Sequence, residues 1–217
     1  MFSVALIGPD GAGKTTIAQK LVRSFPLPVK YLYMGVNAES SNVALPTTRL
    51  AERLKRKNQN RPGRASPRQN SKRKASMLRA GFRLANRLAE EWYRQMLSWH
   101  YRRAGNLVIY DRHFQFDFNG DPRREHGGQK RLTDRLHVWC LAHLYPEPDL
   151  VIYLDAPAEV LFARKGEATM EWLEARRQAF MRQGAQKTNF IQIDATQPLE
   201  VVYKNVEAQI MGFFDLS

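Results

Sequence analysis

Residues 8–15 read GPDGAGKT, and this short stretch decides the fold. It satisfies the pattern G-x-x-x-x-G-K-[ST] at every fixed position, and it lies between the apolar run FSVALI (residues 2–7) and a segment with helical spacing. The glycines let consecutive backbone N–H groups converge on phosphate oxygens, and the start of the helix adds positive potential. The sequence therefore predicts a phosphate-binding P-loop between a buried strand and a helix.

The residues of this loop have predicted parts in binding a nucleoside triphosphate. We expect Lys14 to bridge the β- and γ-phosphates, and the Thr15 hydroxyl to bind Mg²⁺. ATP and Mg²⁺ are therefore the predicted cofactors, and the alternative is a glycine-rich turn with an incidental lysine. The other residues expected to contact the nucleotide belong to the loop and the first helical turn: Gly8, Asp10, Gly11, Ala12, Gly13 and Thr16.

Apolar runs alternate with helical periods along the rest of the chain. This alternation is typical of a parallel sheet with helical crossovers. We predict one α/β domain over residues 1–217, with a three-layer αβα P-loop fold and a five-stranded parallel sheet. The further strands are expected at 29–34, 107–110, 150–154 and 189–195, and the helices at 14–25, 77–101, 132–145, from 158, up to about 186, and at 199–211.

Two polar stretches interrupt this pattern. Residues 55–74 mix Pro, Ser, Asn and Arg without an apolar period, so we expect a loop or disorder there. Residues 112–131 are rich in Gly, Arg and Asp, which predicts a surface loop.

Composition excludes several classes of protein. No apolar run approaches the roughly 20 residues of a membrane-spanning helix, and the N-terminus lacks the basic leader of an export signal. The single cysteine, Cys140, has no internal disulfide partner and lies in the apolar stretch HVWCLAHL. We therefore expect a water-soluble protein of a reducing, cytoplasmic setting.

The formal charge of +13 is concentrated in one part of the chain. Residues 53–87 contain 13 Lys or Arg and no Asp or Glu, and the basic, mobile segment is expected at about 53–76. Three roles stay open for it: a solvated charged loop, steering of anionic substrates, or binding of nucleic acid. No aromatic residue interleaves before Phe82, which counts against nucleic acid.

Four motifs together resemble the thymidylate kinase-like family of nucleoside monophosphate kinases. They are GPDGAGKTT at the start, YDRH at 110–113, PDLVIYLDAPAEVLFAR at 148–164 and IDA at 193–195, in the same order and spacing. The resemblance implies a phosphotransferase that uses ATP and Mg²⁺, and it makes a homodimer a reasonable expectation.

The resemblance also implies roles for single residues. Asp111 resembles a Walker B acid that holds Mg²⁺, and Arg112 resembles an arginine that clamps the acceptor phosphate. Asp10 would reach toward the acceptor, or hydrogen-bond its own turn. His113 would be either a packed ring or a polar contact.

A lid over ATP is implied for residues 164–177. Arg164, Lys165, Arg176 and Arg177 lie at its two ends, and one arginine, with Arg164 as the expected catalytic residue, would neutralise charge on the transferring phosphoryl group. Asp194 and Ala195 would cup the adenine, with a plain strand-end turn as the alternative.

The acceptor half departs from the family pattern. YMGVNAESSN stands where relatives have an Arg-Glu-Pro-Gly run, and FQFDFNGDPRREHGG follows DRH in place of a Ser-x-x-Ala-Tyr-Gln run. We therefore predict transfer of the γ-phosphate of ATP to dTMP, to another nucleoside monophosphate or to a related small acceptor. The alternative is an ATP-binding regulatory or assembly protein that uses the basic segment to bind nucleic acid, membrane or protein.

Overall fold

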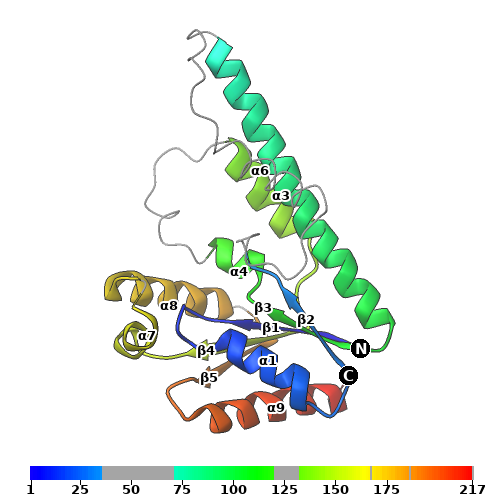
Figure 1. The fold of residues 1–217 in the computed structure, drawn as a ribbon, viewed down its shortest axis with the longest axis vertical. Coiled ribbons are helices and arrows are strands. Elements are labelled where there is room, and N and C mark those ends of the chain that lie inside the picture. Colours follow the sequence, from blue (N-terminus) through cyan, green and yellow to red (C-terminus); the bar gives the residue numbers. More distant parts are fainter. Residues whose placement is uncertain (36–70, 120–131, 167, 186, 217) are drawn as a thin grey trace, which may run out of the picture.

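Helices and strands alternate along the computed structural model, which describes residues 1–35, 71–119, 132–166, 168–185 and 187–216 (Figure 1). Apolar runs end at glycines, prolines or acidic residues, and this punctuation separates the elements. The strands are β1 (Ser3–Ile7), β2 (Val29–Tyr33), β3 (Leu107–Asp111), β4 (Leu150–Asp155) and β5 (Phe190–Asp194). The helices are α1 (Lys14–Ser24), α3 (Ser71–Arg103), α4 (Phe114–Asn119), α6 (Leu132–His143), α7 (Ala158–Lys165), α8 (Met170–Gly184) and α9 (Leu199–Leu216).

In the described part of the chain, the strands form one five-stranded sheet in the order β2-β3-β1-β4-β5. All four pairings are parallel, which confirms the predicted parallel sheet. The chain leaves β1 toward β2 on one side and later returns to β4 on the other side. Such a reversal opens a crevice at the carboxyl ends of the central strands, where ligands of open α/β sheets bind.

Helices cover both faces of the sheet, as the three-layer prediction requires. Figure 1 shows α1 and α9 together on one face, while α3, α4, α6 and α8 lie toward the other. Alternate residues of each central strand point to opposite faces, so β1 contributes Leu6 to the first core and Ile7 to the second. Burying each such side chain contributes roughly 1.5–3 kcal/mol.

Helix α3 begins earlier than the sequence predicts. It starts at Ser71, so residues 71–74 are helical where a loop was expected; residues 55–70 lie outside the described residues. The segment SKRKAS lacks an apolar period, but Lys, Arg and Ala are strong helix formers and extend the helix without one. Helix α9 also runs past the expected Met211, because Phe213 packs edge-on against Phe2 with ring centroids 5.0 Å apart.

The surface loop predicted at 112–131 is wrong in its first part. Residues 114–119 form α4, and Phe114, Phe116 and Phe118 are all buried beneath α6 and α8. Burial of these three phenylalanines was not predicted, because the stretch as a whole is polar in composition. Residues 120–131 lie outside the described residues.

The end of β4 is joined to α8 by a buried carboxylate. Asp155 is 7% exposed and accepts hydrogen bonds from Arg177 Nε at 2.6 Å and Nη2 at 2.9 Å. Tyr153 Oη at 2.9 Å and Gln192 Nε2 at 2.8 Å also donate hydrogen bonds to this carboxylate. Burial alone would raise the pKa of Asp155, but these hydrogen bonds hold it below its ordinary value of 3.8.

We expect Asp155→Asn to lower the free energy of unfolding by about 1–3 kcal/mol at neutral pH, because it removes the charge that Arg177 binds. A depressed folded-state pKa stabilises the protein above the unfolded pKa, and this stability is lost as pH falls through the folded value. The gap between wild type and variant should therefore shrink below about pH 4. Urea unfolding at several pH values measures this difference in the free energy of unfolding between wild type and variant. A difference that does not change with pH would contradict the ion pair between Asp155 and Arg177.

Candidate functional site

The loop between β1 and α1 forms a tight backbone ring at the carboxyl edge of the sheet. Gly8 has φ 144° and Gly11 has φ 89°. A Cβ at Gly8 would lie 2.5 Å from the carbonyl oxygen of Leu154, and one at Gly11 would lie 2.8 Å from that of Leu161. Helix α1 begins after Gly13 without a side-chain cap and without an acidic residue in its first turn. Its first amide groups are therefore ready to bind an anion.

Lys14 lies inside this ring. Its Nζ donates a hydrogen bond to the carbonyl oxygen of Pro9 at 2.6 Å, and the residue is buried. Burial, together with the positive charge of Arg112, lowers the pKa of Lys14 to about 7. A polyphosphate in the ring would reverse this effect, because its negative charge favours the ammonium form.

The end of β3 holds the first turn of α1 through one carboxylate. Asp111 Oδ2 accepts hydrogen bonds from Thr15 Oγ1 at 2.6 Å and from Tyr31 Oη at 2.8 Å. Its other oxygen, Oδ1, is buried and has no hydrogen-bond partner in the structure. Burial and the charge of Asp111 raise the pKa of Tyr31, so the phenol stays a donor. Tyr31 was not among the predicted site residues. The alternation of side chains along β2 places it on one face of the sheet but does not show which residues it contacts.

The residues present at Thr15 and Asp111 fit a magnesium site that needs phosphate oxygens to complete it. The orphaned Asp111 Oδ1 and the Thr15 hydroxyl are hard oxygen ligands, which Mg²⁺ prefers. Within the described residues there is no group of three or more His, Cys, Asp or Glu that could hold a metal ion.

Arg112 has a strained backbone beside the loop. It is the non-glycine residue with positive φ (69°) among those described, a conformation that costs of order 1–3 kcal/mol and is concentrated at functional sites. Its guanidinium forms an ion pair with Asp10. Burial raises the pKa of Asp10, but the charges of Arg112 and Lys14 outweigh burial and hold it below 3.8. The structure thus brings together two of the predicted site residues.

The side of the site toward α3 and α8 carries further paired arginines. Arg176 Nη2 donates to Asp117 Oδ1 at 2.9 Å, and both side chains are buried. Arg94 Nη1 donates to the carbonyl oxygens of Gly35 at 2.9 Å and Tyr33 at 3.3 Å. Asp117 and Arg94 were not predicted as site residues. Asp117 falls in the stretch that was predicted to be a surface loop, and Arg94 belongs to no recognised motif.

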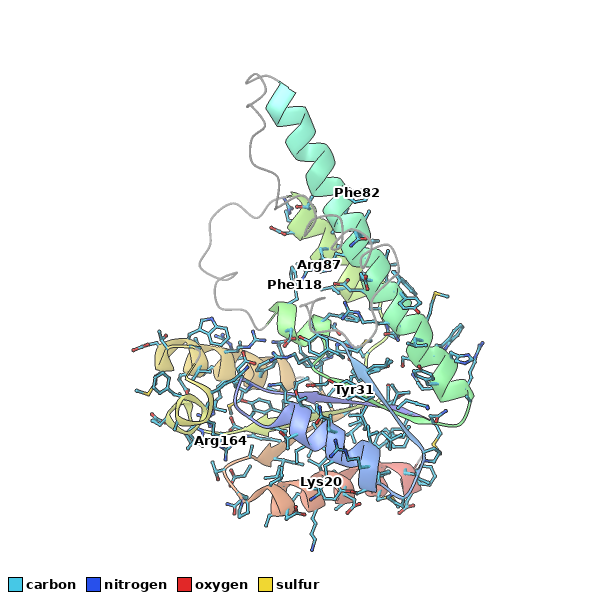
Figure 2. The ribbon with its side chains drawn as sticks, viewed as in Figure 1. Lys20, Tyr31, Phe82, Arg87, Phe118 and Arg164 are labelled. Atoms are coloured by element: carbon cyan, nitrogen blue, oxygen red, sulfur yellow. The ribbon has the colours of Figure 1, made fainter. Side chains whose placement is uncertain are left out.

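The arginines expected in the lid divide between two places. Arg176 and Arg177 bind Asp117 and Asp155, so the middle of α8 is fixed to the body of the protein. Arg164 is exposed on α7, and its Nη1 donates to the carbonyl oxygen of Ala195 at 2.8 Å. Figure 2 shows Arg164 on the α7 side of α1, away from Tyr31.

A cavity of about 260 Å³ lies between the P-loop helix and the turn after β5. Asp194 does not line it; its carboxylate accepts hydrogen bonds from Thr196 and Gln197, which lower the pKa of Asp194 to about 2. Asp194 is thus a turn residue in this structure, the alternative that the sequence left open. The cavity is lined by Gly11, Ala12, Gly13, Thr16, Ile17, Arg164, Ala195, Gln197, Leu199 and Val202.

His113 is a packed ring. It is fully buried, with ring centroids 4.5 Å from Phe114 and 5.9 Å from Phe116, and its two ring nitrogens have no hydrogen-bond partner. Burial lowers the pKa of His113 to about 3, so it stays neutral. Of the two roles left open by the sequence, the structure favours packing.

No helix in the described residues is long and apolar enough to span a bilayer.

We expect Gly8→Ala to be more destabilising than Gly105→Ala. Both glycines have positive φ, 144° and 77°, but a Cβ at Gly105 meets nothing within 4 Å, whereas at Gly8 it collides with the Leu154 carbonyl. Gly105→Ala therefore carries backbone strain of about 1 kcal/mol, and Gly8→Ala should lose at least about 2 kcal/mol because the loop must also move. Urea unfolding compares them, and equal losses would refute the close contact.

Comparisons with known proteins show what this fold is similar to. No family model and no curated protein matches the sequence. A solved deoxyadenosine kinase from M. mycoides with bound dATP is 14% identical with a TM-score of 0.56, and the alignment covers 96% of this chain and 98% of that one. The same kinase with bound dCTP gives 13% identity and a TM-score of 0.54, over 97% and 99% of the two chains. At this identity the likeness shows a shared fold and no more.

Proposed function

We propose that the chain is a P-loop kinase that transfers the γ-phosphate of ATP to a nucleoside or nucleoside monophosphate. The observation that carries this proposal is the buried Asp111 carboxylate, which holds Thr15 at 2.6 Å and keeps its second oxygen free of hydrogen bonds beside the phosphate loop. The fold shared with deoxyadenosine kinases supports the reaction class. Neither neighbour is a thymidylate kinase, so the thymidylate kinase-like resemblance stays a prediction.

The donor side would bind the triphosphate through the loop amides and Lys14. Because Lys14 Nζ rests on the Pro9 carbonyl, it is held at the loop and can exchange that contact for phosphate oxygens. Thr15 and Asp111 would hold Mg²⁺. When bound, Mg²⁺ would neutralise charge on the phosphates. Phosphoryl transfer needs positioning and charge stabilisation rather than covalent chemistry, and this constellation supplies both.

The cavity beside Ala195 is suited to the base of the donor nucleotide. It continues from the P-loop residues Gly11 and Thr16 to the turn after β5, and its volume of about 260 Å³ is close to the lower end of ligand pockets. Arg164 lies at its edge with a planar guanidinium fixed by the Ala195 carbonyl, so a purine ring could stack on it. We therefore propose Arg164 as a base contact in place of the expected catalytic role.

The acceptor side favours an uncharged acceptor. In the described residues, three buried or half-buried arginines on this side are already paired: Arg112 with Asp10, Arg176 with Asp117, and Arg94 with two carbonyls. Breaking one of these pairs to bind an acceptor phosphate would leave a buried or half-buried carboxylate or carbonyl unsatisfied, which costs about 1–3 kcal/mol for a buried group. We therefore propose that a nucleoside is preferred over its monophosphate.

We expect Lys14→Ala to lower kcat at least about 100-fold, because the lysine stabilises charge on the transferring phosphoryl group. Lys20→Ala is the matched control: Lys20 lies on the same helix but points to α9, where it pairs with Glu200 (Figure 2). Coupled ADP release measures both. A Lys14→Ala enzyme with near wild-type turnover, while still folded by circular dichroism, would exclude this role.

The acceptor is tested by ADP release with ATP and Mg²⁺ against paired nucleosides and nucleoside monophosphates. We expect kcat/KM for the best nucleoside to exceed that for its monophosphate at least about tenfold, the equivalent of one lost hydrogen bond to a charged group. A preference for the monophosphate would refute the proposal of an uncharged acceptor but would leave the proposed kinase activity in place. ATP binding without transfer to any acceptor would instead support the regulatory alternative.

A further inference from the structure

The turn after β5 places an amide side chain at the cavity beside the P-loop. Gln197 lines this cavity together with Ala195, and the turn leads from Asp194, the last residue of β5, to Leu199, the first residue of α9. Helix α9 lies beside α1, so the turn comes next to the P-loop helix although the two belong to opposite ends of the chain (Figure 1). The turn therefore adds a polar side chain to the cavity that begins at the P-loop.

A carboxylate fixes the orientation of this amide. Gln197 Nε2 donates a hydrogen bond to Asp194 Oδ2 at 3.0 Å, while Asp194 Oδ1 accepts from Thr196 N at 2.8 Å and Thr196 Oγ1 at 2.6 Å. These bonds lower the pKa of Asp194 to about 2, so the carboxylate is ionised at neutral pH and can only accept. The nitrogen of the Gln197 amide must therefore face Asp194, and the carbonyl oxygen Oε1 is the end that remains for the cavity.

The neighbouring groups of the turn also withhold their donors. Ala195 N donates to the carbonyl oxygen of Asp155 at 2.7 Å, and the Thr196 donors are bound by Asp194. The Ala195 carbonyl accepts from Arg164 Nη1 at 2.8 Å and keeps a second lone pair. At the base of the cavity, Gln197 and Ala195 thus offer acceptors to a ligand.

The other walls of the cavity contact a ring without reading its edge. Ile17 and Val202 are buried apolar residues that line it, and the Arg164 guanidinium is a flat surface for stacking. Such contacts are nearly the same for any purine, because all purines have apolar faces of similar size. Discrimination between purines must therefore come from hydrogen bonds at the edge of the base.

We propose that Gln197 selects adenine as the base of the donor nucleotide by accepting a hydrogen bond from its 6-amino group, and that Asp194 is the positioning residue that sets the amide for this contact. The assignment rests on the proposed role of the cavity as the donor-base site. Adenine carries an amino donor at position 6, where guanine and hypoxanthine carry an oxygen acceptor. Oε1 would face that oxygen with no hydrogen between them, so the 6-oxo bases bind less well.

Calorimetric titration of the full-length protein with the Mg²⁺ complexes of ATP and inosine triphosphate tests the selection. The two nucleotides share the ribose and the triphosphate but have opposite groups at position 6. We expect Kd for inosine triphosphate to exceed Kd for ATP about tenfold, the equivalent of one hydrogen bond. Gln197→Ala should bring the ratio of the two Kd values close to one, mainly by weakening ATP.

Gln178→Ala is the matched control for this titration. Gln178 Nε2 also donates to a carboxylate, Glu174 Oε1 at 3.0 Å, but the residue lies on α8 and is not among those that line the cavity. This variant should keep the wild-type ratio of Kd values. Equal Kd values for the two nucleotides in the wild type, or a preference for ATP that Gln197→Ala retains, would overturn the proposal.

Asp194→Asn tests the positioning role. An asparagine can donate as well as accept, so the Gln197 amide could turn over and present Nε2 to an oxygen at position 6. We expect the ratio of Kd values to fall at least about threefold, because inosine triphosphate gains a donor while ATP keeps its contact in the other orientation. If Asp194 served only the turn, the variant would weaken both nucleotides alike, and an unchanged ratio would refute the positioning role.

These titrations need no acceptor, so they separate this inference from the proposed kinase activity. Selective binding of ATP without phosphoryl transfer to any acceptor would leave the role of Gln197 in place and overturn only the proposed reaction. Transfer from ATP and inosine triphosphate with equal kcat/KM, together with equal Kd values, would do the reverse.

Discussion

The buried carboxylate of Asp111 is the contact on which the site depends. It joins three elements: β3 carries it, Thr15 at the start of α1 donates to it at 2.6 Å, and Tyr31 of β2 donates at 2.8 Å. The phosphate loop therefore cannot shift without breaking a partly buried hydrogen bond to a charged group, which is worth about 1.5–3 kcal/mol. The second oxygen of the same carboxylate has no hydrogen-bond partner, whereas most buried polar atoms have one, and this is the oxygen that the proposed magnesium site would use.

Paired charges surround this anchor. Arg112 is bound by Asp10 and Arg176 by Asp117, so the side of the site opposite the cavity is rigid and nearly neutral without any ligand. In the proposed reaction, such preorganisation would lower the reorganisation needed during phosphoryl transfer. It also limits what can bind, because an incoming anion would have to compete with carboxylates already in place. Neutrality and rigidity are thus two results of the same ion pairs.

The fold could be predicted because the sequence signals for its strands and helices are local, whereas only part of the site could be predicted. The strands and the P-loop follow from apolar runs ended by glycine or aspartate, and Asp111 and Arg112 follow from their position after β3. Asp117 could not be found this way, because FQFDF alternates over a polar background and gave no helical period. Tyr31 and Arg94 were missed for another reason: their roles come from partners in distant elements, and one sequence contains no record of such pairings.

Helix α3 connects the site to the outer surface. Its inner side holds Arg94 against the Gly35 and Tyr33 carbonyls at the end of β2, and its outer side carries exposed Phe82, Met96 and Trp99. Leu88, Leu97 and Tyr101 of the same helix pack against the second core, so apolar contacts hold α3 on the sheet while Arg94 holds the end of β2. Both kinds of contact belong to one helix, so a change that loosened the packing of α3 would also move the end of β2.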